Sequence, residues 1–410
     1  MINLNINPFE NSSGAVVNID SVGGNDLFVT PFNQLLIAEE TPLIQIHFVY
    51  GIFSDLTLTN IGNGGTVTSL QSIANISSSI STNGFANIYS KKIIHYRSGQ
   101  SSIVRLSALF TQGVTGSRQE IGLSNGSDSL LFGYNDTVFG IKIIRNGVET
   151  FIPQSSWNKD KLDGTGKSEI SLDPTKGNIY LITFQWLGFG TLCFYIYSPT
   201  GNLILVHQVQ YANDNTVVSL VNPSFKLYAG ISKISGNSDI VLKISCMAAS
   251  SAGRSTLATY HFRYDDNIGI AADIIEKPIY VLQNKTTFSG IDNFSTVRLH
   301  SASLAATLKR ITFRFYKGYV HNTTGGTFID VDTINSCTTV NKTPATLTTK
   351  TGLTQIFSTT IETDTSILIE LERIMADARD IAPNEYLIIT AIANGSNTYA
   401  SVSLGWLELR

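Results

Sequence analysis

Apolar and polar residues alternate with a period of two along the chain from about residue 101 onward. In the segment 103–110 every second residue is apolar, whereas Arg105 and Ser107 fall between the apolar positions. This pattern predicts a strand with one buried face. The apolar positions are Val104, Leu106, Ala108 and Phe110.

Three further strands are expected in close succession. Segments 180–186, 191–197 and 203–209 carry apolar alternation, and they are separated by Leu-Gly-Phe-Gly at 187–190 and Ser-Pro-Thr-Gly-Asn at 198–202. Glycine, proline and asparagine in such short connections are typical of tight turns. Strands at roughly ten-residue spacing with turn residues between them predict an antiparallel β-sandwich or jelly roll.

The C-terminal part repeats this pattern, with clean alternation at 310–315. Only residues 370–380 combine good helix formers with apolar steps of three and four, so one short helix at most is expected. A run of small residues at 248–253 predicts a linker. We therefore expect an all-β chain of tandem jelly-roll sandwiches, with an irregular N-terminal arm or assembly region (1–85), a concanavalin-like jelly roll (86–250) and a second sandwich (255–410).

Composition narrows the classes of partner. Of the 410 residues, 14% are charged against about a quarter in an ordinary domain, and the net charge is -3. Without a basic block there is no electrostatic basis for binding nucleic acid. The sequence also lacks the roughly 18 to 20 consecutive apolar residues that a membrane span needs. Neither partner is expected.

Two kinds of ligand site are expected to be open to the polar stretch 157–177. Asp160, Asp163 and Asp173 could offer carboxylate oxygens to calcium, or each could close its own turn by accepting backbone hydrogen bonds. Trp157 could stack on a sugar ring, with Asn158, Asp160 and Asp163 as its polar partners, although a tryptophan next to a turn is more often an anchor in the core. His207 shares a predicted strand face with apolar residues, which indicates a buried, hydrogen-bonded histidine.

Catalytic motifs are not evident. Glycoside hydrolysis needs two carboxyl groups facing each other across a sugar, and nothing in the spacing of the available acids pairs any two of them. The available acids are Glu120, Glu149, Asp160 and Glu169. The nucleophile elbow, the phosphate-binding loop and the dinucleotide fingerprint are missing as well. We therefore expect no enzymatic activity, no catalytic residue and no cofactor beyond the calcium considered above.

The order of several segments resembles that of virion structural proteins from tailed bacteriophages and large double-stranded DNA viruses, over roughly residues 20 to 245. The blocks around Trp157 and Trp186 are the most specific. The segments are Asn25–Phe28, Pro31–Leu36, His95–Ser101, Gln119–Leu123, Phe132–Asn135, Trp157–Gly166, Leu172–Thr175 and Trp186–Gly190.

This resemblance implies a particle protein whose middle domain is similar to the laminin-G or concanavalin-like jelly roll, and it brings no catalytic residue with it. We therefore expect a non-enzymatic virion protein, namely a capsid-associated, vertex, fibre or decoration subunit. It would form a homo-oligomer, most simply a trimer, and would contact other capsid or tail proteins. The alternative is a carbohydrate-binding module for host attachment, in which loops of the middle sandwich hold a host glycan.

Overall fold

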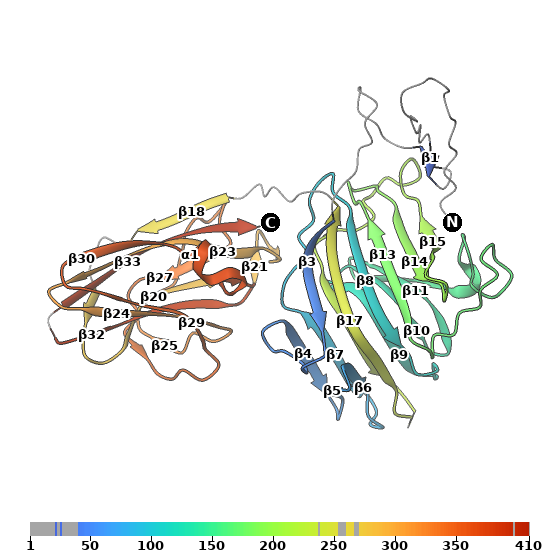
Figure 1. Cartoon of the computed structure of the whole chain (residues 1–410), viewed down its shortest axis with the longest axis horizontal. Helices are drawn as coiled ribbons and strands as arrows, with labels where there is room; N and C mark the ends of the chain where they lie inside the picture. The colour runs from blue at the N-terminus through green and yellow to red at the C-terminus, as the bar shows by residue number, and fades with distance from the viewer. Residues whose placement is uncertain are drawn as a thin grey trace, which may run out of the picture.

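The computed structural model describes residues 21–22, 25–26, 40–236, 238–252, 260–265, 270–396 and 398–409. They form two β-sandwiches, which Figure 1 draws side by side, the first in blue to yellow-green and the second in orange and red. The expected all-β class with tandem antiparallel sandwiches is confirmed. Ahead of them, β1 (Ser21–Val22) pairs with β2 (Asn25–Asp26).

The first sandwich is a jelly roll with one seven-stranded and one eight-stranded antiparallel sheet. The seven-stranded sheet has, in spatial order, β12 (Val148–Pro153), β11 (Val138–Arg145), β10 (Ser129–Asn135), β9 (Ser117–Ser124), β16 (Lys226–Lys233), β7 (Phe85–Ser90) and β4 (Thr57–Gly62). The eight-stranded sheet has β15 (Leu203–Val209), β14 (Leu192–Tyr197), β13 (Asn178–Phe184), β8 (Ser102–Leu109), β17 (Val241–Ala252), β6 (Ile73–Ser77) and β5 (Thr66–Leu70), while β3 (Glu40–His47) pairs with β17.

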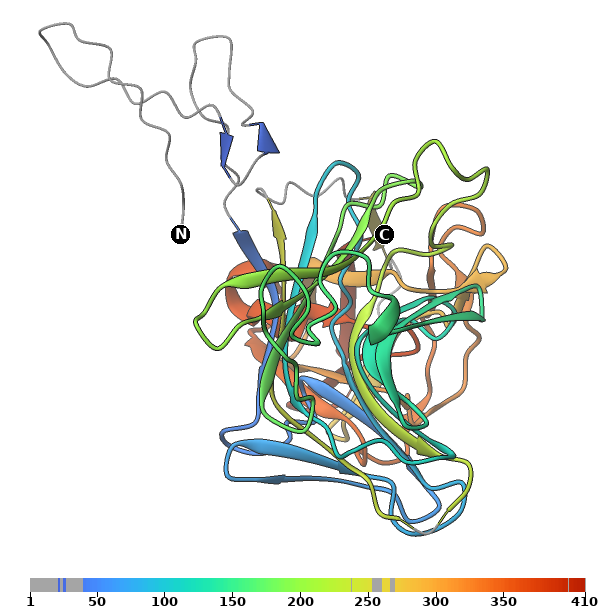
Figure 2. The same cartoon turned by 90° about the vertical axis from the view of Figure 1, so that its right-hand side faces the viewer.

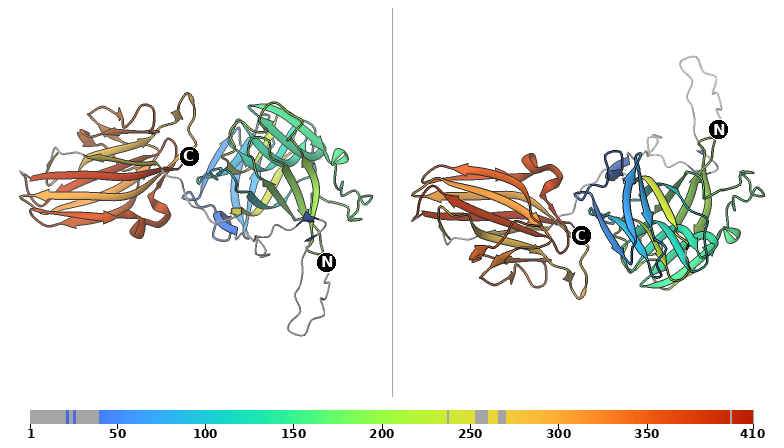
Figure 3. Two further views of the ribbon diagram at one scale, coloured as in Figure 1. Left: turned by 90° about the horizontal axis from the view of Figure 1, so that it is seen from above. Right: turned by 90° about the horizontal axis from the view of Figure 1, so that it is seen from below.

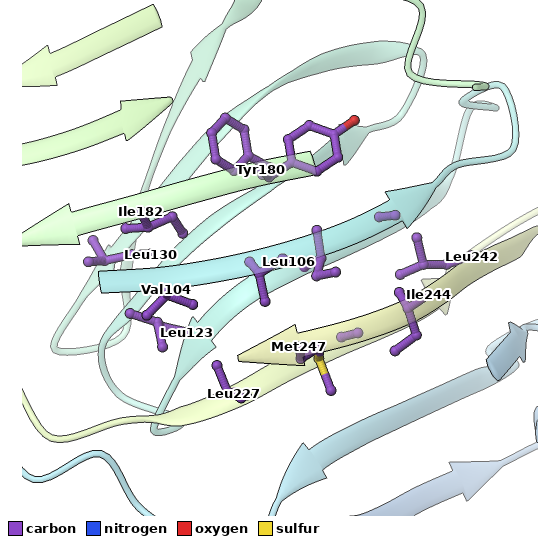
Figure 4. Packing of buried hydrophobic residues seen from close by; sticks show 14 of the residues in the cluster. Val104, Leu106, Leu123, Leu130, Tyr180, Ile182, Leu227, Leu242, Ile244 and Met247 are labelled. Carbon is purple, nitrogen blue, oxygen red and sulfur yellow. The ribbon is translucent and has the colours of Figure 1, made fainter. Parts of the chain in front are cut away.

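The period of two explains these strands. Along β8 buried and half-buried residues alternate without a break, as predicted for segment 103–110. The strands β13, β14 and β15 follow one another in the same sheet, as their turn residues predicted. Apolar side chains from both sheets meet between them, and Figure 4 shows several from β8, β13 and β17 turned toward one interior.

The second sandwich contains two six-stranded sheets and a core of its own. One sheet has β18 (Tyr260–Asp265), β33 (Thr398–Leu409), β23 (Thr296–Thr307) and β30 (Thr365–Glu370), with β19 (Ile270–Ala272) on β33 and β31 (Asp380–Ile381) on β23. The other has β26 (Ile329–Asp330), β27 (Thr338–Asn341), β20 (Lys277–Asn284), β32 (Tyr386–Ala393), β24 (Ile311–Gly318) and β29 (Thr354–Ile361).

Short elements complete this sandwich. Among the described residues the only α-helix is α1 (Leu371–Met375), which the 3₁₀ turn η2 (Ala376–Arg379) continues, so the expected single short helix is present. Two small ribbons pair β21 (Thr287–Phe288) with β22 (Ile291–Asp292), and β25 (Thr323–Thr324) with β28 (Thr346–Leu347). The remaining short turn, η1 (Gln154–Ser156), follows β12 in the first sandwich.

Two expected boundaries are corrected. Strands β3 to β6 belong to the sheets of the jelly roll, so the arm expected over residues 1–85 does not extend beyond residue 39. In Figure 2, β4 and its neighbours are the blue strands at the bottom of this body. Their apolar residues are needed to close the core, since Ile44 and Ile46 are buried in it. Residues 1–20, 23–24 and 27–39 lie outside the described part.

Residues 248–252 of the small-residue run do not form the expected linker. They form the end of β17, whose backbone pairs with β3 on one side and β8 on the other. Small side chains satisfy this ladder as well as large ones do, because the hydrogen bonds come from the backbone. The connection between the sandwiches therefore falls within residues 253–259, which lie outside the described part. Figure 3 shows the two bodies from above and below.

Candidate functional site

The outer face of the seven-stranded sheet carries the densest arrangement of polar and aromatic side chains in the jelly roll. Its strands present alternate residues to this face, because their other residues fill the core. The register aligns Phe151, Lys142, Leu131, Gly122, Tyr228, Tyr89 and Leu58 across the seven strands in one row. The next row is Pro153, Gly140, Gly133, Glu120, Gly230, Asn87 and Asn60.

Aromatic rings lie across glycines on this face. A Cβ atom added to Gly140 would come within 2.8 Å of Cζ of Phe151, and one added to Gly62 would meet the ring of Phe85. At Gly230 the added atom would meet the hydroxyl of Tyr228. Aromatic side chains beside strand glycines occupy the space that the missing Cβ atoms leave. All three rings are half-buried rather than enclosed.

Lys142 stands at the centre of a group of four charges. Its ammonium contacts the Glu120 carboxylate directly and lies 3.5 Å from the carboxylate of Glu149, which in turn accepts a bond of 3.1 Å from Arg118. The lysine side chain is 3% exposed, whereas both carboxylates remain partly open to solvent. A buried ammonium needs such partners, because an unpaired charge at that depth would be strongly destabilising. The group is neutral overall.

Two tyrosines extend this group toward β7. The rings of Tyr89 and Tyr228 lie 4.9 Å apart, and the Tyr228 hydroxyl donates a hydrogen bond of 3.1 Å to Oδ1 of Asn87. Burial, reinforced by the Glu120 carboxylate, raises the pKa of both phenols, so each remains protonated and able to donate. The face thus combines donors, acceptors and ring surfaces.

The residues proposed for sugar stacking do not lie on this face. Trp157 is 2% exposed and packs edge-on against Phe132 and Phe139 in the core, so it has no ring surface to offer a ligand. The anchor role that the sequence left open is the one it has. Asn158 exchanges two hydrogen bonds with the backbone of Gln208 and thereby fastens the loop to β15.

The three aspartates proposed for calcium act in separate turns. Asp160 is buried and accepts from the backbone N–H groups of Leu162 and Ser168, whereas Asp163 and Asp173 each accept from the threonine two residues ahead. Over the described ranges, no group of three or more histidine, cysteine or acidic side chains comes together to hold a metal ion. The calcium site is therefore not supported, because the carboxylates are occupied by the local backbone.

A pocket of about 460 Å³ opens at the end of this sandwich, and it does include Asp163. It lies between the turn that joins β10 to β11 and the loop that follows β12. Tyr134 and Phe139 line it together with Gln154 and Lys161. Of the proposed residues, Asp163 thus lines this pocket.

Sequence reasoning named Glu120 and Glu149 but did not pair them. They lie on strands β9 and β12, which the meander β9–β10–β11–β12 brings to one face. A signal was available in the sequence, because Gly122, Gly133 and Gly140 recur in three successive apolar segments, which the structure shows to be β9, β10 and β11. Glycine in a strand interior often marks a close approach of a ligand or of another side chain.

Comparison with known proteins gives a fold and no family. No protein family matches the chain, and no curated protein matches it either. Similar solved structures include arcelin-5, a lectin-like defence protein from Phaseolus vulgaris, at 10% identity and a TM-score of 0.34, covering 52% of this chain and 99% of that one. A Bacillus licheniformis β-glucanase reaches 11% identity, a TM-score of 0.34 and coverages of 52% and 99%. A glycosyl hydrolase family 16 protein from Mycobacterium smegmatis reaches 10% identity, a TM-score of 0.36 and coverages of 51% and 100%.

These matches correct one expectation. The chain was expected not to be an enzyme, and structures of glucanases and an endo-acting O-glycanase stand among those similar to its jelly roll. The absence of a local motif does not by itself exclude catalysis, because two carboxylates can meet through the pairing of strands. At this identity the likeness concerns the fold alone.

A membrane-crossing helix was not expected, and none of the helices in the described ranges is long and apolar enough to be one.

Proposed function

We propose that the outer face of the seven-stranded sheet binds a saccharide chain. The observation that carries this proposal is the placement of the side chains of Phe151, Phe85 and Tyr228 against glycines on the same face as the Lys142 group. Sugar rings present apolar C–H faces and rows of hydroxyls, so a matching site needs exposed ring surfaces and a few fixed polar groups. Here both occur on one rigid sheet.

The charges favour a neutral ligand. Arg118 and Lys142 balance Glu120 and Glu149, and each carboxylate keeps oxygen lone pairs that can accept hydroxyl hydrogens. The tyrosine phenols and the Asn87 amide add donors at the other side of the face. A neutral oligosaccharide would find both kinds of partner without adding net charge.

The experiment is a screen of the full chain against an array of neutral oligosaccharides, followed by calorimetry with the best ligand. Phe151→Ala should weaken binding by about tenfold, the effect expected when one ring contact of about 1 to 1.5 kcal/mol is lost. Phe189→Ala is the matched control, since Phe189 is 38% exposed and lies in the β13–β14 turn of the other sheet. Binding unaffected by Phe151→Ala would refute the proposal.

A second candidate function, hydrolysis of the bound chain, is favoured by one specific observation. Both Glu120 and Glu149 contact the single ammonium of Lys142, so two carboxylates from different strands face one point, and a facing pair of carboxyl groups is what glycoside hydrolysis needs. Lys142 stands between them, so a sugar would reach both acids only if the ammonium moved aside. Release of reducing ends that Glu120→Gln and Glu149→Gln both abolish would support hydrolysis, and release unchanged in both would exclude it.

The role in a virion stays a prediction of the sequence resemblance. It would use sheet edges for contacts between copies, and the edge strand β30 offers Ile367 and Leu368 at 45% and 67% exposure. A homo-oligomer, a trimer or a contact with capsid and tail proteins would follow from such edges. Light scattering of the purified chain and its detection in purified particles test this role, and a monomer absent from particles would dismiss it.

A further inference from the structure

The pocket beside the turn between β10 and β11 has a floor and walls of different chemistry. Tyr134 and Phe139 form the floor, are 4% and 5% exposed, and contact each other edge-on with ring centroids 5.1 Å apart. Lys161 and Asp163 contribute one charge of each sign to the wall. At about 460 Å³ the pocket falls within the usual range of roughly 300 to 1,000 Å³ for small-molecule sites.

The wall of this pocket is held in place by hydrogen bonds. The side-chain amide of Gln154, directly after β12, donates to the carbonyls of Lys161 and Leu162 at 2.9 and 3.1 Å. These bonds tie the loop to the end of the strand. The Gln154 side chain also carries a carbonyl oxygen that can accept a hydrogen bond.

The pocket begins where the sugar-binding face ends. Val138 occupies an outward position of β11, in step with Gly140 and Lys142, and it also lines the pocket. On the neighbouring strand β12, Pro153 pairs with Gly140 and lies on the same outer face. The next residue, Gln154, lines the pocket. A chain lying along the face toward this end of the sheet therefore arrives at the pocket.

We propose that this pocket receives the terminal unit of the saccharide chain bound on the face, and so makes the protein recognise a chain end. The proposal rests on the proposed function. The charges of Lys161 and Asp163 cancel, the floor is aromatic, and the wall offers amide and hydroxyl groups, which together fit an uncharged, hydroxyl-rich ring. An internal unit is not expected there, because the pocket lies at the edge of the sheet, where the turn after Asn135 joins β10 to the start of β11.

Thr137→Trp in the full chain tests this assignment by filling the pocket. Thr137 is exposed and lines the cavity, and Thr66→Trp is the matched control, on exposed strand β5 of the other sheet. With the array oligosaccharide that the unmodified chain binds best, Thr137→Trp should weaken binding at least tenfold, whereas Thr66→Trp should leave it unchanged. Equal binding by both variants would overturn the pocket assignment. Thermal melting verifies that both variants are folded.

A labelled ligand gives the second readout. The same oligosaccharide is prepared with a bulky fluorophore on its reducing end or on its non-reducing end. Binding should survive one label and be lost by at least tenfold with the other, and tolerance of both labels would refute end recognition. If the unmodified chain binds nothing on the array, the proposed function fails; if it binds and Phe151→Ala weakens it while Thr137→Trp does not, only the pocket assignment fails.

Discussion

Individual residues in the loop 157–177 illustrate how burial decides the role of a side chain. Trp157 and Asp160 have the chemistry of ligand-binding residues, yet both are almost fully buried. Trp157 fills space between the sheets, and Asp160 satisfies two backbone donors that would otherwise be unpaired. Their contribution is to the stability of the jelly roll.

Replacement of Trp157 by alanine should therefore destabilise the protein by roughly 3 to 5 kcal/mol, the usual cost of removing a large buried ring. Denaturant unfolding measures the loss. Trp157→Phe is the control, because it keeps an aromatic ring in the space and should cost clearly less. If Trp157→Ala weakened saccharide binding while unfolding stayed unchanged, Trp157 would be a ligand contact after all.

His207 should make stability depend on pH. It is buried in β15, and its Nδ1 accepts from the N–H of Asn158 at 3.2 Å. Burial lowers the pKa of His207, so the unfolded chain binds a proton more readily than the folded one. Stability from this group is fully present above the unfolded pKa of about 6.5 and is lost as the pH falls below it.

His207→Gln should flatten that dependence. The free energy of unfolding is measured at several pH values between 7.5 and 4.5, and its slope against pH gives the number of protons taken up on unfolding. In the variant this number should be smaller than in the unmodified chain by up to about one. Gln replaces the imidazole with a side chain that does not titrate. Identical slopes in the two proteins would show that His207 does not couple folding to pH.

At the scale of single strands, the glycines of the seven-stranded sheet serve two different purposes. A Cβ atom added to Gly133 would collide with the backbone carbonyl of Gln119 on the adjacent strand, whereas the nearest atoms to one added to Gly230 are the side-chain ends of Asn87 and Tyr228. The backbone of β9 cannot move away without breaking its hydrogen bonds to β10, but the side chains of Asn87 and Tyr228 can rotate. Gly133 is thus required by the sheet and Gly230 by the surface arrangement.

Gly133→Ala and Gly230→Ala form a matched pair. The first should lower the free energy of unfolding by about 1 to 3 kcal/mol, the usual penalty for overpacking. The second should leave unfolding nearly unchanged but displace the Tyr228–Asn87 hydrogen bond and weaken saccharide binding several-fold. Thermal denaturation and calorimetry distinguish the two, and equal destabilisation by both would contradict the assignment.

The whole molecule consists of two separately packed bodies. Every residue of the first core lies between Ile44 and Ala249, and every residue of the second between Ala272 and Trp406. Contacts between the bodies include a hydrogen bond of 2.9 Å between Nε2 of His95 and the hydroxyl of Thr296, and the ammonium of Lys91 over the Tyr319 ring. Such contacts are few beside either core.

Residues 40–252 alone should therefore fold. We expect this fragment to keep its near-ultraviolet circular dichroism and to unfold in one cooperative transition. It should also bind the array ligand of the full chain, since the face and the pocket both lie within it. A fragment without fixed aromatic signals would show that the second sandwich is needed for the first to pack.

Much of the fold was predictable because strand formation depends on local alternation. The buried face of β8, the turn residues before and after β14, and the short helix α1 all follow from spacing that is visible within ten residues. The early strands β3 to β6 were missed for the same reason. Glycine- and serine-containing stretches separate them, and pairing with β7, with β17 or with one another makes them part of the sheets.

By itself, the sequence determined that this chain forms antiparallel sandwiches, because the identity of each side chain decides which face of a strand is buried. The tertiary structure alone decided the site. Glu120 and Glu149 lie 29 positions apart, and three successive hairpin pairings bring their carboxylates to one ammonium. The pairing of strands depends on contacts between residues that are distant in sequence. Neither the charged group around Lys142 nor the pocket at the end of the sheet could therefore be deduced from spacing along the chain.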